Sequence, residues 1–275
     1  MKTKISIILI TKNEEKNIKI CLESLLLLGA QEIIIVDNGS TDNTLNIIKN
    51  IADNNIGINI QTYIHSDWQG FGYQKNTALS YTANDYILSI DADEVVSLEL
   101  CQSIQDICIN NNLDDIESSM YKIQRLNYFC GKQVNYSGWQ NDKVIRLFNK
   151  KYAKFSDDKV HEKVIFNQNS HIQYDKQNNL AINCINGLLH HYSYTSFSQV
   201  LEKIDQYSSL GAEQLYKRNK KSSFITAVMH GISAFIKSFI VKLGFLDKGV
   251  GFNIALMNAL ASYYKYIKLK QIHDK

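Results

Sequence analysis

Hydrophobic residues recur at two different spacings along the first 118 positions. Short runs rich in β-branched residues, typical of buried strands, cover residues 4–11 (KISIILIT), 32–37 (EIIIVD), 58–64 (INIQTYI) and 85–90 (DYILSI). Apolar residues at helical spacing cover the intervening residues 14–28, 40–52 and 73–81. Because strands and helices alternate, the pattern predicts a parallel sheet with helices packed on it.

The pattern changes twice in the rest of the chain. After about residue 118 it consists of short, tyrosine-rich runs of mixed polarity, such as MYKIQRLNYF, which indicate further strands. From Ser196 onward it is helical. We therefore predict an α/β domain over residues 1–195, with halves of 1–118 and 119–195, followed by a helical region over residues 196–275.

Composition narrows the class of protein. The chain has 275 residues, of which 45% are hydrophobic, so it can bury one large core or two modest ones. Five cysteines without a CxxC pair indicate reduced thiols rather than disulfides or a zinc site. The first residues do not have the pattern of a signal peptide, so we expect a cytoplasmic protein. The formal net charge of +3 is too small to indicate a nucleic-acid partner.

The charge is unevenly distributed along the chain. Residues 201–275 contain 12 Lys and Arg against 5 Asp and Glu, whereas residues 1–200 contain 18 against 22. Within the basic part, residues 224–246 are apolar around most of a helix. Lys237 and Lys242 would each cost about 2.5–3.5 kcal/mol at the centre of a bilayer, so the segment is either a core helix or one that lies in the membrane interface. Because the surrounding lysines attract anionic lipid, we favour peripheral attachment to the inner leaflet of the inner membrane.

Polar clusters follow three of the predicted strands. TKNEE (11–15) follows the first strand, DNGSTD (37–42) the second and DADE (91–94) the fourth. Each alone could be a turn with helix-capping residues, but ligands of open α/β sheets bind at the carboxyl ends of the strands. The first cluster lacks the GxGxxG of a dinucleotide-binding domain, and the chain lacks the GxxxxGK[ST] loop of P-loop NTPases. A phosphatase with a nucleophilic Asp would carry it directly after the first strand, where the sequence has TKN.

Two carboxylates of DADE, Asp91 and Asp93, raise a specific chemical question. If the backbone stays extended, they point the same way about 6–7 Å apart, since a strand rises about 3.3 Å per residue. Like charges at that distance repel unless a proton or a cation neutralises them. Carboxylate oxygens suit Mg²⁺ or Mn²⁺, which keep other positions for water and phosphate. The alternative is a solvated acidic turn before a helix over residues 97–109.

Together, these motifs resemble a known enzyme family. SIILITKNEEKNIKICLESL, IIIVDNGSTDNT, GFGYQKNTAL and ILSIDADE are similar to the nucleotide-sugar half of family 2 inverting glycosyltransferases, which have a GT-A fold. The later stretches GWQNDKVIRLFNK, DDKVHEKV and GFLDKGVGFNIALMNALASYYKYIKLK resemble the bacterial lipopolysaccharide-core branch, which adds glucose to inner-core sugar. The resemblance covers essentially the whole chain. It implies an α/β fold of the GT-A type, with a mixed sheet and a C-terminal helical extension.

The resemblance also implies roles for residues near the three strand ends. The nucleotide-sugar donor would be bound by Thr11, Asn13, Glu14, Asp37, Lys75, Asn76 and Asp91. Asp37 would accept a hydrogen bond from the base, and Asp91 would face the ribose. Asp93 would bind a Mn²⁺ or Mg²⁺ cofactor that bridges the diphosphate, and His161, unless it is structural, would complete the metal site. Lys75 and Asn76 would lie near the base or the pyrophosphate, and the alternative for both is an ordinary helix start.

The resemblance implies that Asp142 is the catalytic base. An inverting transfer is one displacement, so a carboxylate opposite the leaving diphosphate must take the proton of the acceptor hydroxyl. Asp142 matches the position of this base in the family, and Arg146 would share its face in an extended strand and hold it ionised. The alternative is a structural Asp–Arg pair, and Glu162 is the next candidate for the base.

Three further side chains allow two interpretations each. Trp139 could stack on a sugar ring or pack inside the protein, and His190 and His191 could line an acceptor cleft or form a structural pair.

The resemblance implies an enzyme that moves glucose, or a related hexose, from a UDP-sugar to a lipid-linked saccharide at the cytoplasmic face of the membrane. Another glycan or a polyprenyl phosphate is the alternative acceptor. A catalytically inactive nucleotide-sugar-binding scaffold belongs to a different class, and the presence of Asp37, Asp91, Asp93 and Asp142 argues against it.

Overall fold

The computed structural model describes residues 3–110, 120–157, 162–167 and 182–274. The chain forms two compact units. Unit 1 contains residues 1–125 and 143–191, and unit 2 contains residues 126–142 and 192–275. Residues 126–142 therefore belong to the same compact unit as the C-terminal helices. The predicted domain boundary at residue 195 stays a prediction.

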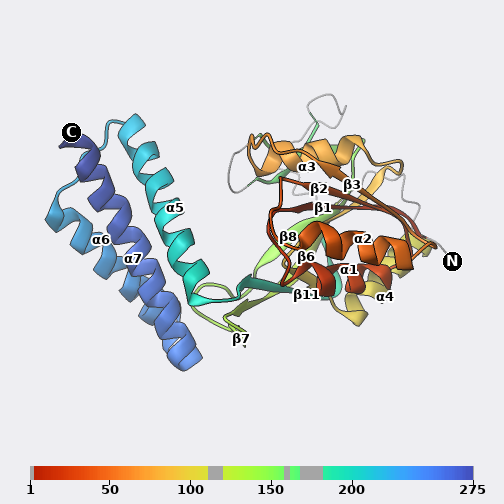
Figure 1. Ribbon diagram of the computed structural model, residues 1–275. Coiled ribbons are helices and arrows are strands. Elements are labelled where there is room, and N and C mark those ends of the chain that lie inside the picture. Colours follow the sequence, from red (N-terminus) through yellow and green to blue (C-terminus); the bar gives the residue numbers. More distant parts are fainter. Residues whose placement is uncertain (1–2, 111–119, 158–161, 168–181, 275) are drawn as a thin grey trace. The chain divides into compact units, whose positions relative to one another are not determined.

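Unit 1 is built on parallel strands. They are β1 (Thr3–Thr11), β2 (Ala30–Asp37), β3 (Asn59–Ile64) and β4 (Tyr86–Asp91), in the order β3-β2-β1-β4. The connections between them contain α1 (Ile18–Leu26), α2 (Thr44–Asn54) and α3 (Phe71–Ser80). Figure 1 shows α3 on one face of these strands and α1 and α2 on the other. The predicted parallel sheet covered by helices is confirmed.

The sheet continues beyond β4 with strands of mixed direction. The order continues through β8 (Lys143–Asn149), β6 (Met120–Phe129), β11 (Asn183–Tyr194) and β5 (Glu94–Val96). The β4–β8, β6–β8 and β5–β11 pairs are antiparallel. The remaining elements of this part are β7 (Lys132–Gln133), paired with β6, the pair β9 (Ala153–Phe155) and β10 (Val164–Phe166), and α4 (Leu98–Asn110). A mixed sheet with helices, followed by C-terminal helices, confirms the predicted GT-A fold class.

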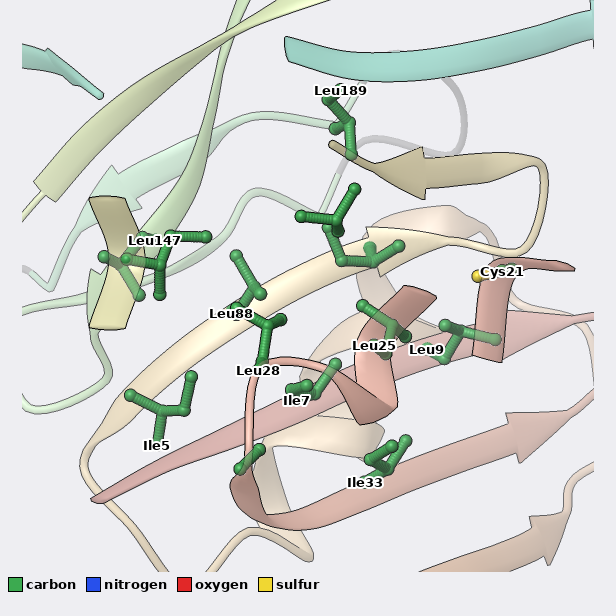
Figure 2. Packing of buried hydrophobic residues seen from close by; sticks show 14 of the residues in the cluster. Ile5, Ile7, Leu9, Cys21, Leu25, Leu28, Ile33, Leu88, Leu147 and Leu189 are labelled. Carbon is green, nitrogen blue, oxygen red and sulfur yellow. The ribbon is translucent and has the colours of Figure 1, made fainter. Parts of the chain in front are cut away.

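The parallel strands are buried on both faces. Ile5, Ile7 and Leu9 of β1 lie in one cluster with Leu25 of α1, as Figure 2 shows. Ile8 points to the opposite face and packs in the cluster that contains residues of α3. Two buried faces explain why the strand has a continuous apolar run rather than an alternating one. Each fully buried Ile or Leu side chain contributes about 1.5–3 kcal/mol relative to an exposed one.

The first helix begins later than the sequence predicted. The pattern placed helix from residue 14, but α1 begins at Ile18. Asn13 has a φ of 54°, and the amides of Glu14 and Glu15 donate to side chains of the loop before α2. Because a distant loop satisfies these amides, residues 13–17 connect β1 to α1 without being helical.

Unit 2 is mainly helical. It contains α5 (Phe197–Lys217), α6 (Phe224–Ile236), the π-helical turn η2 (Lys237–Val241), the 3₁₀ turn η3 (Gly244–Asp247) and α7 (Lys248–His273). Figure 1 shows α5, α6 and α7 side by side, and α7 packs against both of the others. Phe129, Val134, Val200, Ile204 and Ile254 are its buried core. The prediction of helices after Ser196 is confirmed.

One helical segment among the described residues is long and apolar enough to cross a membrane, by length and composition only. It covers Phe224–Val241, with a mean hydropathy of 1.7, and only 17% of it is buried. Five of its exposed apolar side chains recur every three or four residues and so share one helix face: Ile225, Met229, Ile232, Ile236 and Ile240. An interfacial helix would have the same pattern.

Candidate active site

The three polar clusters meet at one edge of the parallel sheet. Thr11, the last residue of β1, is in register with Asp37, the last residue of β2. Ile10 of β1 is in register with Asp91, the last residue of β4. The amide of Asn38 donates to the Thr11 carbonyl (2.9 Å) and continues the pairing past the strand ends. The clusters therefore lie at the carboxyl edge, where sheets of this kind bind ligands.

The loops that follow β1 and β2 hold each other in place. Asp37 is fully buried, and its carboxylate accepts hydrogen bonds from the amides of Gly39 (2.9 Å) and Ser40 (2.8 Å) and from the Ser40 hydroxyl (2.5 Å). Asn13 Oδ1 accepts from the Thr41 amide (2.8 Å), and the Asn13 amide donates to Ser40 Oγ (2.9 Å). Asp37 therefore fixes the shape of its own loop, and the contact with a base predicted for it would use its remaining lone pairs.

Thr11 and Glu14 lie in the same two loops. The Thr11 hydroxyl is buried and has no hydrogen-bond partner among the described residues. A buried polar group left without a partner costs about 1–3 kcal/mol, so a ligand atom that bonds to this hydroxyl would recover that cost. Glu14 is half-buried, and its Oε2 accepts from the side-chain amide of Asn17 (2.8 Å).

The backbone turns immediately after Asp91. β4 ends at Asp91, Ala92 and Asp93 form a turn, and β5 begins at Glu94. The turn is held by the fully buried Glu94, whose Oε2 accepts from the Asp91 amide (2.9 Å). The backbone is therefore not extended from Asp91 to Asp93, so the condition for the two carboxylates to point the same way is not met, and they have different partners.

Two buried cations neutralise Asp91. Lys75 Nζ lies 2.7 Å from Oδ1, and Arg146 pairs with Oδ2. Burial by itself raises the pKa of Asp91, but the charges of Arg146 and Lys75 outweigh burial and hold the pKa well below its ordinary value. Arg146 also lies 2.5 Å from Glu94 Oε1, and Arg125 lies 3.5 Å from the same oxygen. The charge of Asp91 is therefore balanced by the protein itself.

Lys75 connects Asp91 to a second carboxylate. It is 2% exposed, and its Nζ lies 2.7 Å from Glu162 Oε1, so it is part of a buried ion network rather than an ordinary helix start. Its neighbour Asn76 holds β9: Nδ2 donates to the carbonyl of Phe155 and Oδ1 accepts from its amide, both at 3.0 Å. The nucleotide contact predicted for Asn76 stays a prediction.

Asp93 faces a histidine that lies far away in the sequence. Asp93 Oδ2 lies 3.5 Å from His191 Nε2, and the two side chains are only 19% and 18% exposed. The pair forms because β11 pairs with β5, with His191 in register with Glu94. His161, which the sequence suggested as the second metal ligand, lies outside the described residues.

A carboxylate and an imidazole suit a divalent ion such as Mn²⁺, which accepts oxygen and nitrogen ligands. No group of three or more His, Cys, Asp and Glu side chains in the described ranges could hold a metal by itself. An ion at Asp93 and His191 would therefore also need phosphate and water oxygens, which Mg²⁺ and similar ions usually keep as ligands in nucleotide sites. With these additional oxygen ligands, Asp93 and His191 fit the predicted metal ion.

Asp142 belongs to unit 2, and its carboxylate accepts a hydrogen bond within that unit. Its Oδ2 accepts from the side-chain amide of Asn127 (3.0 Å). The pair of Asp142 with Arg146 stays a prediction. Within unit 1 the Arg146 guanidinium pairs with Asp91 and Glu94. Glu94 is fully buried at the turn after β4, where an adjacent cation compensates for the lost water.

Two of the other candidates, Trp139 and His190, are at least partly shielded from solvent. The Trp139 ring lies against Phe129 (centroids 6.2 Å apart) and Tyr194 (6.3 Å), which favours packing over sugar stacking. His190 is half-buried, and burial lowers its pKa, so its ring is neutral near pH 7.

Sequence reasoning underestimated His191 and Glu94. Glu94 belongs to the DADE cluster, but its role depends on the turn that brings it to the Asp91 amide. The contact of His191 with Asp93 depends on the pairing of β5 with β11. Strand periodicity shows that each segment is a strand, but it does not show which strands become neighbours across some 90 residues. The histidine that meets Asp93 could therefore not be chosen from the sequence.

Comparison with known proteins gives a family match. Residues 6–175 match the model of a family described as glycosyl transferase family 2. An uncharacterised glycosyltransferase of Rickettsia typhi is 35% identical over 275 residues, which covers 99% of this chain and 88% of that protein. A lipopolysaccharide core biosynthesis glycosyltransferase of Rhizobium meliloti is 25% identical over 274 residues, covering 99% of this chain and 94% of that protein.

Among solved structures, a mannosyltransferase of Pyrobaculum calidifontis in complex with GDP-Man and Mn²⁺ aligns with 95% of this chain and 74% of its own. The TM-score is 0.48 and the identity 14%. The family assignment rests on the two stronger comparisons, the family model and the Rickettsia relative.

Proposed function

Because the chain belongs to glycosyl transferase family 2, we propose that it is an inverting glycosyltransferase that moves glucose, or a related hexose, from a UDP-sugar to a lipid-linked saccharide. Inner-core lipopolysaccharide is the proposed acceptor. The observation that carries this proposal is the pair of Asp93 and His191 beside the charge-balanced Asp91 at the ligand-binding edge of the sheet.

The donor would lie across the loops that follow β1, β2 and β4. Asn13, Glu14 and Asp37 would surround the nucleoside, and the buried Thr11 hydroxyl is available to it as a hydrogen-bond donor or acceptor. Asp91 would face the ribose, held in one orientation by Lys75 and Arg146. A side chain fixed in this way loses little conformational entropy on binding, which favours affinity.

Asp93 and His191 would hold a Mn²⁺ or Mg²⁺ ion on the donor diphosphate. When bound, such an ion neutralises the charge that develops on the leaving UDP. Asp93 suits this task better than Asp91, because Asp91 already has two cations of the protein against its oxygens.

Asp142 would act as the base. Its carboxylate would take the proton of the acceptor hydroxyl while the acceptor oxygen bonds to the anomeric carbon and the bond from that carbon to the diphosphate breaks. UDP leaves with the bonding electrons, and the anomeric configuration is inverted in this single step. Asn127 donates a hydrogen bond to Oδ2 of Asp142 and so helps to orient the carboxylate.

The acceptor class is supported by the Rhizobium relative, which is named as a glycosyltransferase of lipopolysaccharide core biosynthesis and matches nearly the full length of both chains. A lipid-linked acceptor also fits a protein that binds to a membrane surface. The exposed apolar face of α6 and η2 would enter the lipid interface, and exposed lysines at its ends, including Lys220, Lys221, Lys242 and Lys248, would attract anionic headgroups at about 1 kcal/mol each. We therefore propose peripheral attachment to the cytoplasmic face of the inner membrane.

Mass analysis of lipopolysaccharide tests the acceptor and the sugar together. A strain that lacks the gene should make core lipopolysaccharide shorter by one hexose, and the purified enzyme with UDP-glucose should add that hexose to the extracted material. Unchanged lipopolysaccharide in the deletion strain would exclude this acceptor. Tight UDP-glucose binding without turnover on lipopolysaccharide, polyprenyl phosphate or other glycans would indicate a binding scaffold instead.

A further inference from the structure

The C-terminal stretch GFLDKGVG contains an aspartate that binds a loop of unit 2. Asp247 Oδ1 accepts a hydrogen bond from the Asn135 amide (3.0 Å), and Oδ2 accepts from the Tyr136 amide (2.9 Å) and the Ser137 hydroxyl (3.1 Å). The Ser137 amide donates to the Lys242 carbonyl (2.9 Å). Charged acceptors form stronger hydrogen bonds than neutral ones, so these contacts anchor residues 135–137 to η3.

The glycines of the same stretch show that this anchor is tightly packed. A Cβ on Gly251 would lie 1.7 Å from the Gly244 carbonyl oxygen. A Cβ on Gly244 would lie 2.8 Å from the Ser238 carbonyl oxygen and 3.0 Å from Ser137 Oγ. There is thus no room for a side chain at the contact of η3 with Ser137 and with the start of α7. This close packing restricts the backbone that carries Asp247.

The anchored loop continues to Asp142. The Trp139 amide donates to the Tyr136 carbonyl (3.0 Å), which closes a turn directly after the anchored residues. At the far end, the side-chain amide of Asn127 donates both to the Trp139 carbonyl (3.3 Å) and to Asp142 Oδ2 (3.0 Å). The loop that carries Asp142 is therefore fixed at its start by Asp247 and at its end by Asn127.

We propose that Asp247 is a positioning residue for Asp142: it holds residues 135–137 so that the Asp142 carboxylate stays where it can reach the acceptor hydroxyl. This inference rests on the proposed function, in which Asp142 is the base. A displacement of about 1 Å in a catalytic group can cost about 10²-fold in rate, so loss of the anchor lowers turnover although Asp247 does not touch the substrate.

Asp247→Asn is the first test variant, because it keeps the size of the side chain but replaces one acceptor oxygen with an NH₂ group, which cannot accept the amide hydrogen bond. Ser137→Ala removes only one of the contacts and should give a weaker effect of the same kind. Asp274→Asn is the matched control, since Asp274 is an exposed carboxylate of the same unit, paired only with Lys270 on the surface.

Two independent measurements, hydrogen exchange and turnover, are made on each variant. Hydrogen exchange at the amides of residues 135–137 should become at least about tenfold faster in Asp247→Asn and stay unchanged in the control. Turnover of UDP-glucose with lipopolysaccharide from the deletion strain should fall about 10–100-fold, with the donor KM changed less than about twofold. Unchanged exchange, or a kcat within twofold of wild type in folded Asp247→Asn, would overturn the proposal.

A double variant separates positioning from a general loss of structure. If Asp247 acts through Asp142, then Asp247→Asn should lower kcat little further in the Asp142→Asn background, because both changes remove the same step. Equal losses in both backgrounds would show that Asp247 acts independently of Asp142, which contradicts the proposal. Full activity of Asp142→Asn alone would instead refute the assignment of the base, while hydrogen exchange would still report on the anchor.

Discussion

At the residue scale, Asp91 keeps its negative charge because Lys75 and Arg146 face its two oxygens. The carboxylates of this turn also act on the thiol of Cys21, which lies 3.7 Å from the Asp91 carbonyl oxygen. Burial raises the pKa of Cys21, and the negative charges of Glu94, Asp93 and Asp91 raise it further, so the thiol stays neutral. Asp91 and Glu94 have Lys and Arg partners, whereas Asp93 faces His191, so Asp93 is the carboxylate of this turn that suits a bound cation.

A metal held by Asp93 and His191 gives a clear expectation. Transfer should stop in excess EDTA and return with Mn²⁺ or Mg²⁺. Asp93→Ala should be inactive but folded, and His191→Gln should need about 10-fold or more Mn²⁺ for half-maximal activity, since one ligand is lost. His273→Gln, at the end of α7, serves as the control for loss of a histidine. Full activity in excess chelator would contradict the metal assignment.

At the scale of secondary structure, the loop before α2 links the β1 and β2 ends of the site. Asp42 Oδ1 accepts from the Thr44 amide (3.0 Å) and the Thr44 hydroxyl (2.6 Å) at the start of α2, and Oδ2 accepts from the Glu15 amide (3.1 Å). Burial raises the pKa of Asp42, but these hydrogen bonds lower it more, so the net pKa lies below the ordinary value.

Asp42→Asn should lower the free energy of unfolding by about 0.5–1.5 kcal/mol at pH 7, because an NH₂ group replaces one accepting oxygen and the charge that strengthens these hydrogen bonds is lost. Because the pKa of Asp42 is lower in the folded state, its contribution is fully present above the ordinary Asp pKa of about 3.9 and is lost as the pH falls below it. Urea unfolding of both proteins at pH 7 and at low pH checks this. A difference in stability that stays the same, or grows, at low pH would contradict the role of the ionised carboxylate.

The elements themselves could be predicted because β-branched runs and helical spacing record burial directly. The strands β1, β2, β3 and β4 and the clusters at their ends followed from that pattern. The late start of α1 and the turn after Asp91 did not, since both depend on side chains that accept hydrogen bonds from backbone amides: Thr44 and Asp42 for α1, and Glu94 at the start of β5 for the turn. Likewise, the pairing of Arg146 with Asp91 and Glu94 could not be predicted, because it depends on β8 lying beside β4 in the sheet.

At the scale of the whole molecule, the exposed face of α6 and η2 predicts binding to anionic membranes. The protein should sediment with vesicles that contain phosphatidylglycerol at low salt and be released at high salt. Replacing Ile232 and Ile236 with Ser should weaken binding severalfold, because each apolar side chain removed from the interface loses favourable burial. Ile56→Ser is the control, since Ile56 is 94% exposed and lies in unit 1.

Sedimentation that depends on neither lipid nor salt would contradict membrane attachment. If the Ile232 and Ile236 variant still sedimented like wild type, lysines alone would account for the binding, and the apolar face would have another partner. A change in oligomeric state of the variant would identify that partner as a second copy of the chain.

The central claim is that this protein is a glycosyltransferase in which Asp142 takes the proton of the acceptor. The most direct measurement compares the wild type with Asp142→Asn, which keeps the shape of the side chain but is a far weaker base. UDP-glucose binding by calorimetry should be nearly unchanged, while hexose transfer to lipopolysaccharide from the deletion strain should fall by at least about 10²-fold. Transfer by Asp142→Asn at close to the wild-type rate would contradict the account and make Glu162 the next base to test.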